Sequence, residues 1–211
     1  MNVALINGSP KSTSSASASL LKELKNYLNK EFVQEYAFHT NHAAENASSI
    51  FSHTPEILVF AFPLYVDGVP GHLLRCMKSL EEYLQALPNE NGNIYTIVNC
   101  GFFEGEQTGH ALDIMKNWCK RTPLHWGQGI GIGGGGMLES IQNVPAGKGP
   151  RKNISQILLS LSHHILKKET APNQFTSPNI PRFLYRLAAQ KNWRSEIQNN
   201  GLQTKDLFRQ L

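Results

Sequence analysis

The residues best suited to chemistry lie between positions 8 and 19, in the stretch GSPKSTSSASAS. Six serine or threonine residues fall between Ser12 and Ser19, with Lys11 just before them, an apolar run at 3–6 upstream and a leucine-rich helical pattern downstream. A helix N-terminus offers unpaired N–H groups and a partial positive charge, so it attracts anions. Hydroxyl groups add donors without adding charge. One serine is explained as a helix cap, but six hydroxyls within eight positions favour a phosphate-binding loop.

A second glycine-rich stretch matches a known motif only in its letters. Gly131, Gly133 and Gly136 have the GxGxxG spacing of the dinucleotide fingerprint. They follow the last predicted strand instead of the first, and no acidic residue lies about 20 positions further on. We therefore expect a loop near the ligand here, not a true dinucleotide site.

Cysteine and histidine patterns give no metal or disulfide signal. Cys76, Cys100 and Cys119 are widely spaced, odd in number and without a CxxC pair, which favours reduced thiols in a cytoplasmic protein. The eight histidines lack the spacing of metal ligands. We expect no metal ion.

The elements that position these residues alternate between strand and helix patterns. Strands are predicted at 3–6, 32–38, 56–62, 93–100 and 124–133, and amphipathic helices at 20–28, 73–87, 111–119, 154–165 and 183–197. Such alternation predicts an α/β fold with helices on both faces of a parallel sheet. Five strands fit the flavodoxin-like, doubly wound order 2-1-3-4-5. We expect a domain over 1–168 and, after a Pro- and Asn-rich excursion, a C-terminal helical extension over 169–211 packed on the same domain.

Ligands of this fold bind beyond the carboxyl ends of the strands, where the strand order reverses. The first, third and fourth predicted strands meet at that point. They are followed by NGSPKSTSSAS, PLYVDGVPG and NCGFFEGEQTG, which are rich in glycine, proline or small polar residues. We expect these three loops to lie side by side and form the binding site.

At these loops the chain resembles the flavodoxin-like NAD(P)H-dependent FMN oxidoreductases. GSPKSTSSAS resembles the phosphate loop of that family, FPLYVDGVPG its second flavin loop and NCGFFEGEQ its third. The stretch GIGIGGGGM and the C-terminal NIPRFLYRLAAQKNWRSEIQNNGLQTKDL resemble one branch of the family. The resemblance covers nearly the whole chain.

The resemblance implies an FMN site with residues from all three loops. Its phosphate would be held by Ser9, Lys11, Ser14, Ser15 and the backbone of Ala16. The ring would be lined by Pro63, Leu64, Tyr65 and Val66, and its pyrimidine edge would face Asn99, Cys100, Gly101 and Phe102. Core packing is the alternative role of Tyr65 and Phe102, whereas Cys100 is expected to be a small buried residue without a redox role. No residue is assigned a catalytic role, because the flavin carries the chemistry.

The resemblance implies an oxidoreductase. NAD(P)H delivers a hydride to flavin N5 and leaves, and an electron acceptor then takes the place of the nucleotide. The acceptor class stays open between a quinone, an azo or nitro compound, free flavin and a protein, as does the choice of NADH or NADPH. One alternative is a flavodoxin-type electron carrier without nicotinamide turnover. Another is a phosphate- or nucleotide-binding module without redox chemistry. By analogy with the family, we expect a homodimer.

Composition and charge limit the partners. With 40% apolar and 17% charged residues among 211, the chain reads as a soluble globular protein, without a membrane span or a secretory signal. The net charge of +4 divides into −4 over residues 1–147 (9 basic, 13 acidic) and +8 from residue 148 onward (11 basic, 3 acidic). The basic segment is interpreted either as a solvated helix face or as a surface that attracts an anionic partner. Nucleic-acid binding and membrane binding are not expected.

Overall fold

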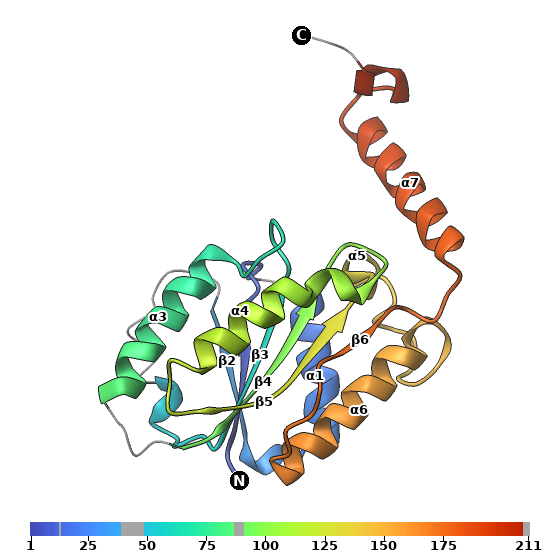
Figure 1. Ribbon diagram of the computed structural model, residues 1–211. Coiled ribbons are helices and arrows are strands. Elements are labelled where there is room, and N and C mark those ends of the chain that lie inside the picture. The colour runs from blue at the N-terminus through green and yellow to red at the C-terminus, as the bar shows by residue number, and fades with distance from the viewer. Residues whose placement is uncertain (13, 39–48, 87–90, 209–211) are drawn as a thin grey trace. The chain divides into compact units, whose positions relative to one another are not determined.

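A computed structural model describes residues 1–12, 14–38, 49–86 and 91–208 (Figure 1). The chain forms two compact units, Met1–Pro178 and Asn179–Leu211. The strands of the first unit are β1 (Val3–Asn7), β2 (Val33–Ala37), β3 (Ile57–Pro63), β4 (Asn93–Asn99), β5 (His125–Ile132) and β6 (Gln174–Thr176). Its helices are α1 (Ala16–Tyr27), α3 (Gly71–Ala86), α4 (Gly109–Cys119), α5 (Gly135–Leu138) and α6 (Lys152–Lys167). Short 3-10 turns cover Lys30–Phe32, Gly105–Thr108 and Gly149–Arg151.

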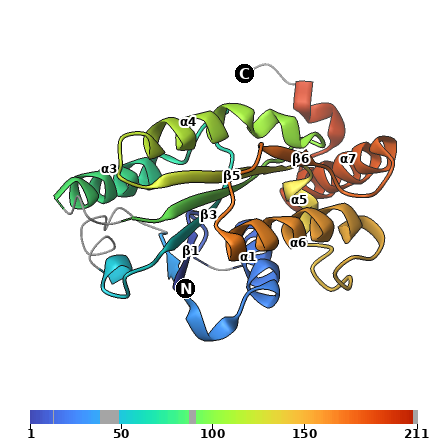
Figure 2. The same cartoon turned by 60° about the horizontal axis from the view of Figure 1, so that its bottom comes forward.

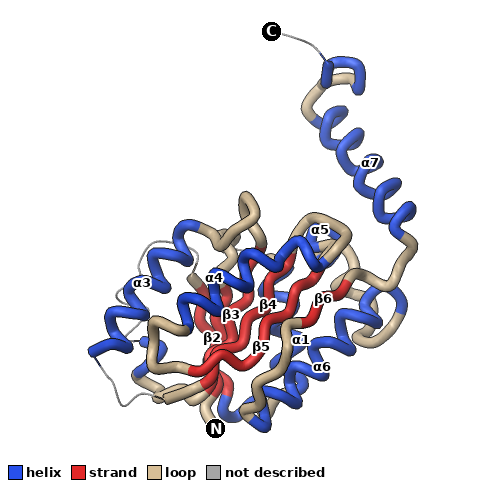
Figure 3. The backbone as a smooth tube through the Cα atoms, in the orientation of Figure 1, coloured by secondary structure: helices blue, strands red, loops and turns tan. Residues whose placement is uncertain are grey.

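The six strands form one parallel sheet in the order β2-β1-β3-β4-β5-β6 (Figure 3). The predicted α/β class and the order of the first five strands are confirmed. The sixth strand was not expected. This strand has only three residues. Two side-chain hydrogen bonds hold the segment just before it against β5. Gln128 Nε2 donates to the Pro172 carbonyl (2.8 Å), and Asn173 Oδ1 accepts from the Gly129 N–H (2.9 Å). Residues 169–178 thereby belong to the first compact unit.

Helices cover both faces of the sheet, with α3 and α4 on one side and α1 and α6 on the other (Figure 2). The alternating side chains of β3 serve both layers. Leu58 and Phe60 belong to the cluster that includes α3 and α4, whereas Ile57 and Val59 belong to the cluster with α1 and α6. Burial on both faces explains the nearly continuous apolar run that predicted this strand. Leu87, the last residue of the predicted helix at 73–87, lies outside the described residues, as does Thr13 of the first loop.

The glycines that weaken the strand prediction for β5 have a packing reason. A Cβ at Gly127 would lie 2.4 Å from Cε1 of Tyr95, so the tyrosine ring occupies the place of a side chain. The Tyr95 hydroxyl lies 3.1 Å from the His164 carbonyl oxygen and 2.9 Å from that of Glu169. Burial raises the pKa of Tyr95 to about 12, so the hydroxyl stays protonated and can donate.

The second unit contains the predicted C-terminal helix, α7 (Arg182–Asn199), followed by a 3-10 turn at Thr204–Phe208. None of the α7 residues is buried, and its large apolar side chains Phe183, Leu187 and Trp193 are exposed. The packing of this helix on the domain stays a prediction. Across the described part of the chain, no helix combines the length and the apolar character needed to cross a membrane.

Candidate functional site

The three predicted loops begin next to one another at the carboxyl edge of the sheet. The Gly8 N–H donates to the Ala61 carbonyl (2.8 Å), and the Leu64 N–H donates to the Asn99 carbonyl (2.7 Å). A cleft of about 240 Å³ opens between the loops. Nine of the predicted site residues line it: Ser9, Lys11, Ser15, Ala16, Pro63, Leu64, Tyr65, Asn99 and Gly101. The chain thus brings its hydroxyl-rich loop and its apolar second loop to one cleft.

Local hydrogen bonds shape the first loop, which leads into α1. Asn7 Oδ1 accepts from the Ser9 N–H (3.1 Å), and Ser9 Oγ accepts from the Lys11 N–H (3.3 Å). A Cβ at Gly8 would lie 2.6 Å from Cδ2 of Leu73, so a larger residue here would displace the leucine side chain of α3. These contacts hold the loop close to the sheet and direct it toward the helix.

Ser15 is the N-cap of α1, as its Oγ accepts from the Ala18 N–H (3.1 Å). A capping hydroxyl acts as an acceptor, so its own hydrogen is left for a ligand. Ser15 is buried and lines the cleft. The capping role and the phosphate role weighed from the sequence are therefore compatible.

Two lining residues were missed by the sequence analysis because their partners lie far along the chain. Ser17 Oγ donates to Asn99 Oδ1 at 2.9 Å, and both residues are buried. This bond commits the Asn99 oxygen and leaves its Nδ2 as a donor. The position of Ser17 in the serine-rich stretch was the only feature of the sequence that pointed to this residue. Glu139 lies just after α5, and no local pattern marks it.

Glu139 brings a carboxylate to the end of the cleft where a phosphate was expected. Its Oε1 lies 2.8 Å from Lys11 Nζ, and the two side chains are partly exposed. The positive charge predicted to hold a phosphate is therefore already paired. Any anion in the cleft meets the pair, not an isolated lysine.

The glycine-rich stretch at 131–136 packs directly against the third loop. A Cβ at Gly133 would lie 1.9 Å from the Phe103 carbonyl oxygen, and Gly134 has a φ of +70°, which favours glycine. The Gly135 N–H donates to the Cys100 carbonyl at 2.6 Å. Gly135 and Gly136 line the cleft. Close backbone packing thus accounts for Gly133 and Gly135, and the stretch lies beside the cleft, as expected.

The second loop turns back at residues 65–68. The Tyr65 N–H donates to the Gly68 carbonyl (3.1 Å) and the Gly68 N–H donates to the Tyr65 carbonyl (2.9 Å). Val66 and Asp67 occupy the turn with φ values of 46° and 57°. Val66 is fully exposed and does not line the cleft, although its neighbour Tyr65 does. A β-branched residue with positive φ is a backbone outlier.

Three further predicted residues also lie outside the cleft lining. Ser14 lines a neighbouring cavity, and Phe102 is about half exposed on the third loop. Cys100 is buried, and its thiol donates to the Glu104 carbonyl at 3.5 Å. Burial raises the pKa of the Cys100 thiol to about 11. These features agree with the interpretation of Cys100 as a small buried residue.

Comparisons with known proteins define the fold. Neither the protein-family models nor the curated proteins include a match to this sequence. Among solved structures, a protein described as NADPH-quinone reductase from P. pentosaceus has 14% identity and a TM-score of 0.56, covering 78% of this chain and 96% of that one. The general stress protein 14 of Treponema denticola, solved in complex with FMN, has 11% identity and a TM-score of 0.54 over 78% and 99% of the two chains. A Streptococcus pneumoniae flavodoxin has 14% identity and a TM-score of 0.51 over 79% and 99%.

The sheet order and the cleft at the reversal of strand order define a doubly wound α/β protein with a switch-point site. The solved structures then identify its particular form: the chain has the flavodoxin-like fold.

Proposed function

We propose that this chain is a member of the flavodoxin-like NAD(P)H-dependent FMN oxidoreductases. In this proposal it passes electrons from NAD(P)H through bound FMN to an acceptor. The observation that carries the proposal is the cleft at the switch point, lined by the hydroxyl-rich loop at the start of α1 and by the Pro63–Tyr65 side of the second loop. FMN, when bound, supplies the hydride and electron chemistry. The chain's residues bind and orient it.

The phosphate group of FMN is assigned to the end of the cleft formed by the first loop. Ser15 offers a hydroxyl hydrogen, and the first turn of the twelve-residue α1 offers unpaired N–H groups. Ser9 is buried and lines the cleft nearby. The positive charge of Lys11 is partly offset by the Glu139 carboxylate with which it forms an ion pair. Donors without net charge therefore provide most of the recognition.

The flavin ring is assigned to the opposite end of the cleft. Pro63, Leu64 and Tyr65 supply apolar contact area, and Asn99 Nδ2 can donate to a ring carbonyl because Ser17 engages its oxygen. The cleft is smaller than the roughly 300–1,000 Å³ of an enclosing ligand pocket. A ring bound here keeps one side open, which an exchanging nicotinamide and acceptor both need.

Related structures support a flavin, since one neighbour of the same fold was solved with FMN and another is described as NADPH-quinone reductase. The fold also includes a flavodoxin, so fold likeness alone does not separate an enzyme from a carrier. We propose the enzyme, because the chain is longer than the matched part of that flavodoxin and adds α7 with its basic residues.

The deciding experiment mixes the FMN-loaded protein with NADH or NADPH without oxygen and follows the flavin absorbance. Rapid bleaching by either nicotinamide supports the enzyme. Reduction only by a strong chemical reductant favours the electron carrier. If the apoprotein binds no FMN on titration, both flavoprotein functions fail.

We further propose a cytoplasmic homodimer. Exposed apolar side chains include Val66, Leu74 and Ile114, from the second loop, α3 and α4. Covering these side chains with a second copy of the chain would bury apolar area. Sedimentation at micromolar concentration tests this, and a monomer mass would refute it.

A further inference from the structure

Helix α7 carries its basic residues and most of its large apolar residues on one face. At 3.6 residues per turn, both kinds fall within about 200° of the helix circumference. The members of this face are Phe183, Leu184, Leu187, Trp193 and Ile197, together with Arg182, Arg186, Lys191 and Arg194. The only acidic residue of the helix, Glu196, lies outside it. We call this set the basic face.

The basic face is exposed along most of its length. Phe183, Leu187 and Trp193 are 63%, 57% and 72% exposed, and none of the 18 residues of α7 is buried. Helices in proteins gain most of their stability by packing an apolar face against a partner. Charged and apolar residues alternate here, whereas a helix that lies on a bilayer keeps them on separate faces. Tryptophan and arginine are the residues that dominate binding at protein interfaces, so the basic face is suited to a protein partner.

The first unit has a complementary surface on its second and third loops and the helices that follow them. Residues 63–74 and 100–115 contain four acidic residues and no lysine or arginine. We call the following residues the acidic surface: the exposed apolar Tyr65, Val66, Leu74, Phe102 and Ile114, and the carboxylates of Asp67, Glu104, Glu106 and Asp113. Among the residues that the structure describes, Asp67, Glu106 and Asp113 form no ion pair. Three carboxylates are therefore available to a basic partner.

The two segments of the acidic surface adjoin in the fold. The Leu64 N–H donates to the Asn99 carbonyl, just before the third loop, at 2.7 Å. A Cβ at Gly68 would lie 4.0 Å from Cδ1 of Ile114, so the turn of the second loop lies against α4. Val66, in this turn, is fully exposed and has a φ of 46°. Such backbone outliers collect at binding sites, which favours a partner that contacts the turn.

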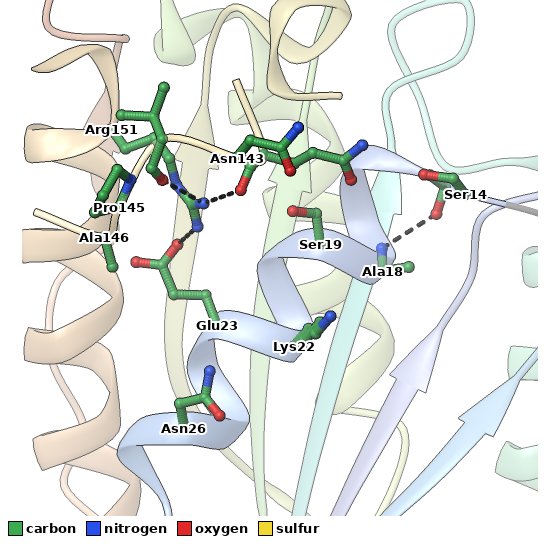
Figure 4. Close-up of a pocket in the computed structure, with 13 residues that line it drawn as sticks. Ser14, Ala18, Ser19, Lys22, Glu23, Asn26, Asn143, Pro145, Ala146 and Arg151 are labelled. Carbon is green, nitrogen blue, oxygen red and sulfur yellow. Dashed lines mark hydrogen bonds and ion pairs between the residues drawn. The ribbon is translucent and has the colours of Figure 1, made fainter. Parts of the chain in front are cut away.

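The opposite side of the sheet does not match the basic face. Residues 148–168, which include α6, contain five lysine or arginine residues and no acidic residue. On α1, Lys22 is exposed, whereas the Glu23 side chain is only 5% exposed and pairs with Arg151 at the neighbouring cavity (Figure 4). A basic helix would be repelled on this side, so charge directs it to the acidic surface.

We propose that the basic face of α7 binds the acidic surface of a second copy of this chain, so that two copies exchange their C-terminal helices. The inference rests on the proposed homodimer and names the surfaces that form it. Basic side chains meet carboxylates, and the apolar residues of both surfaces bury one another. Each copy has both surfaces, so a two-fold exchange satisfies both in one closed dimer. The connection 177–181 has two prolines among its five residues, which limits how the chain can turn back on itself.

The exchange has a consequence for the cleft. Tyr65 belongs to the acidic surface and also lines the cleft. A helix docked on this surface therefore borders the cleft and brings basic side chains close to its open side. Dimer formation is thereby coupled to the affinity for an anionic co-substrate.

The test reverses charges on one surface at a time. The helix variant carries Arg186→Glu and Arg194→Glu, and the loop variant carries Glu106→Lys and Asp113→Lys. All four side chains are exposed, so both variants should keep their fold, which circular dichroism checks. Sedimentation at micromolar concentration and low salt should show a dimer for the unmodified chain and a monomer for each variant. We expect the dimer Kd to rise roughly 100-fold in each, because two charges are reversed at both symmetry-related contacts.

An equimolar mixture of the two variants should restore the dimer. In the mixed dimer the acidic helix of one copy meets the basic loops of the other, and the second contact joins two unmodified surfaces. Trp193→Ala removes an apolar anchor without reversing charge and should raise the Kd roughly 30-fold or more. The matched control, Lys22→Glu with Lys152→Glu on α1 and α6, should leave the dimer unchanged.

The proposal is overturned if the unmodified chain is a monomer, if both variants remain dimers, or if their mixture stays monomeric. Dimers that persist in the variants would leave the homodimer standing and refute only the exchange of helices. A monomer that binds vesicles of anionic lipid through α7 would assign the basic face to a membrane instead. The flavin function is judged separately, by FMN titration and bleaching in the unmodified protein.

Discussion

Lys11 Nζ and Glu139 Oε1 lie 2.8 Å apart at the end of the cleft, although 128 positions separate the two residues. The pair joins the first loop to the end of α5. In the proposed function it means that a phosphate approaches a lysine that already has a carboxylate partner. Phosphate affinity is therefore set by the balance between the two charges.

Replacing Glu139 by Gln should tighten FMN binding. The change removes a negative charge near the assigned phosphate and releases Lys11, and a gain of about 1 kcal/mol, roughly fivefold in Kd, is expected for such partly exposed charges. Riboflavin, which lacks the phosphate, should bind as before. Fluorescence titration of both ligands measures the effect. Glu82→Gln is the control, because Glu82 pairs with Lys78 on the exposed side of α3. Weaker FMN binding in Glu139→Gln would show that the carboxylate positions the lysine productively.

Replacing Ser15 by Ala should weaken FMN more than riboflavin and also lower stability. The phosphate loses a donor, and loss of the N-cap costs about 1 kcal/mol of folding free energy. Ser15→Gly separates the two roles, since glycine as a cap costs only a few tenths of a kcal/mol but equally lacks the hydroxyl. We expect nearly normal melting and the same loss of FMN affinity in this variant. An equal loss for FMN and riboflavin would mean that the hydroxyl serves only as a cap.

Replacing Ser17 by Ala should disturb the ring end of the cleft. The buried Asn99 Oδ1 loses its donor, which costs about 1–3 kcal/mol of stability, and the amide can reorient. FMN and riboflavin affinity should fall by equal factors, because both carry the ring. Ser162→Ala is the control, as its buried hydroxyl donates to the Leu159 carbonyl within α6. If melting temperature falls equally in both variants and flavin affinity in neither, Ser17 has only a structural role.

The buried thiols should make the protein less stable at high pH. Burial raises the pKa values of Cys100 and Cys119 to about 11, above the ordinary value of 9.0. A thiol with a raised pKa binds its proton more tightly in the folded state. This contribution to stability is fully present below pH 9 and is lost as pH rises toward 11. The loss should be at most about 1.4 kcal/mol per pH unit for each thiol.

Urea unfolding at several pH values measures that loss. Iodoacetamide labelling read by mass spectrometry should be slow at both cysteines in the native state near neutral pH. Fast labelling of Cys100 at pH 7 would show that its thiol ionises far more easily than its burial implies.

Charge reversal at Arg182 and Arg186 should raise the KM for NAD(P)H if the basic helix α7 attracts the anionic co-substrate. Attraction between exposed charges is screened over about 10 Å at 0.1 M salt, so added salt should produce the same rise in the unmodified protein. Melting temperature should change little. Steady-state kinetics at low and high salt measure the effect. Unchanged kinetics at low salt would favour the alternative interpretation, that these arginines lie on a solvated helix face. A large drop in melting temperature would indicate a structural role for them.

Local patterns in the sequence determined the fold class and the position of the candidate cleft. The apolar run at 56–62 predicted β3 because a strand buried on both faces needs apolar residues in succession. Leu73, Met77, Leu80 and Leu84 predicted α3 because burial of one helix face repeats every three or four residues. Once the strand order was predicted, the loops after the first, third and fourth strands had to meet at one edge of the sheet. A periodic pattern can be read from residues close together in the chain, because it shows which face of a strand or helix is suited to burial.

Only the tertiary structure decided the contacts between distant residues. β6 is too short for a periodic signal and depends on Gln128 and Asn173 for its docking. Glu139 reaches Lys11, and Ser17 reaches Asn99, only because the turns after the strands have particular paths. Those paths are set by close approaches such as that of Gly133 to the Phe103 carbonyl, where even one added carbon would not fit. Such contacts depend on packing distances in three dimensions, and a one-dimensional pattern of residue types does not contain them.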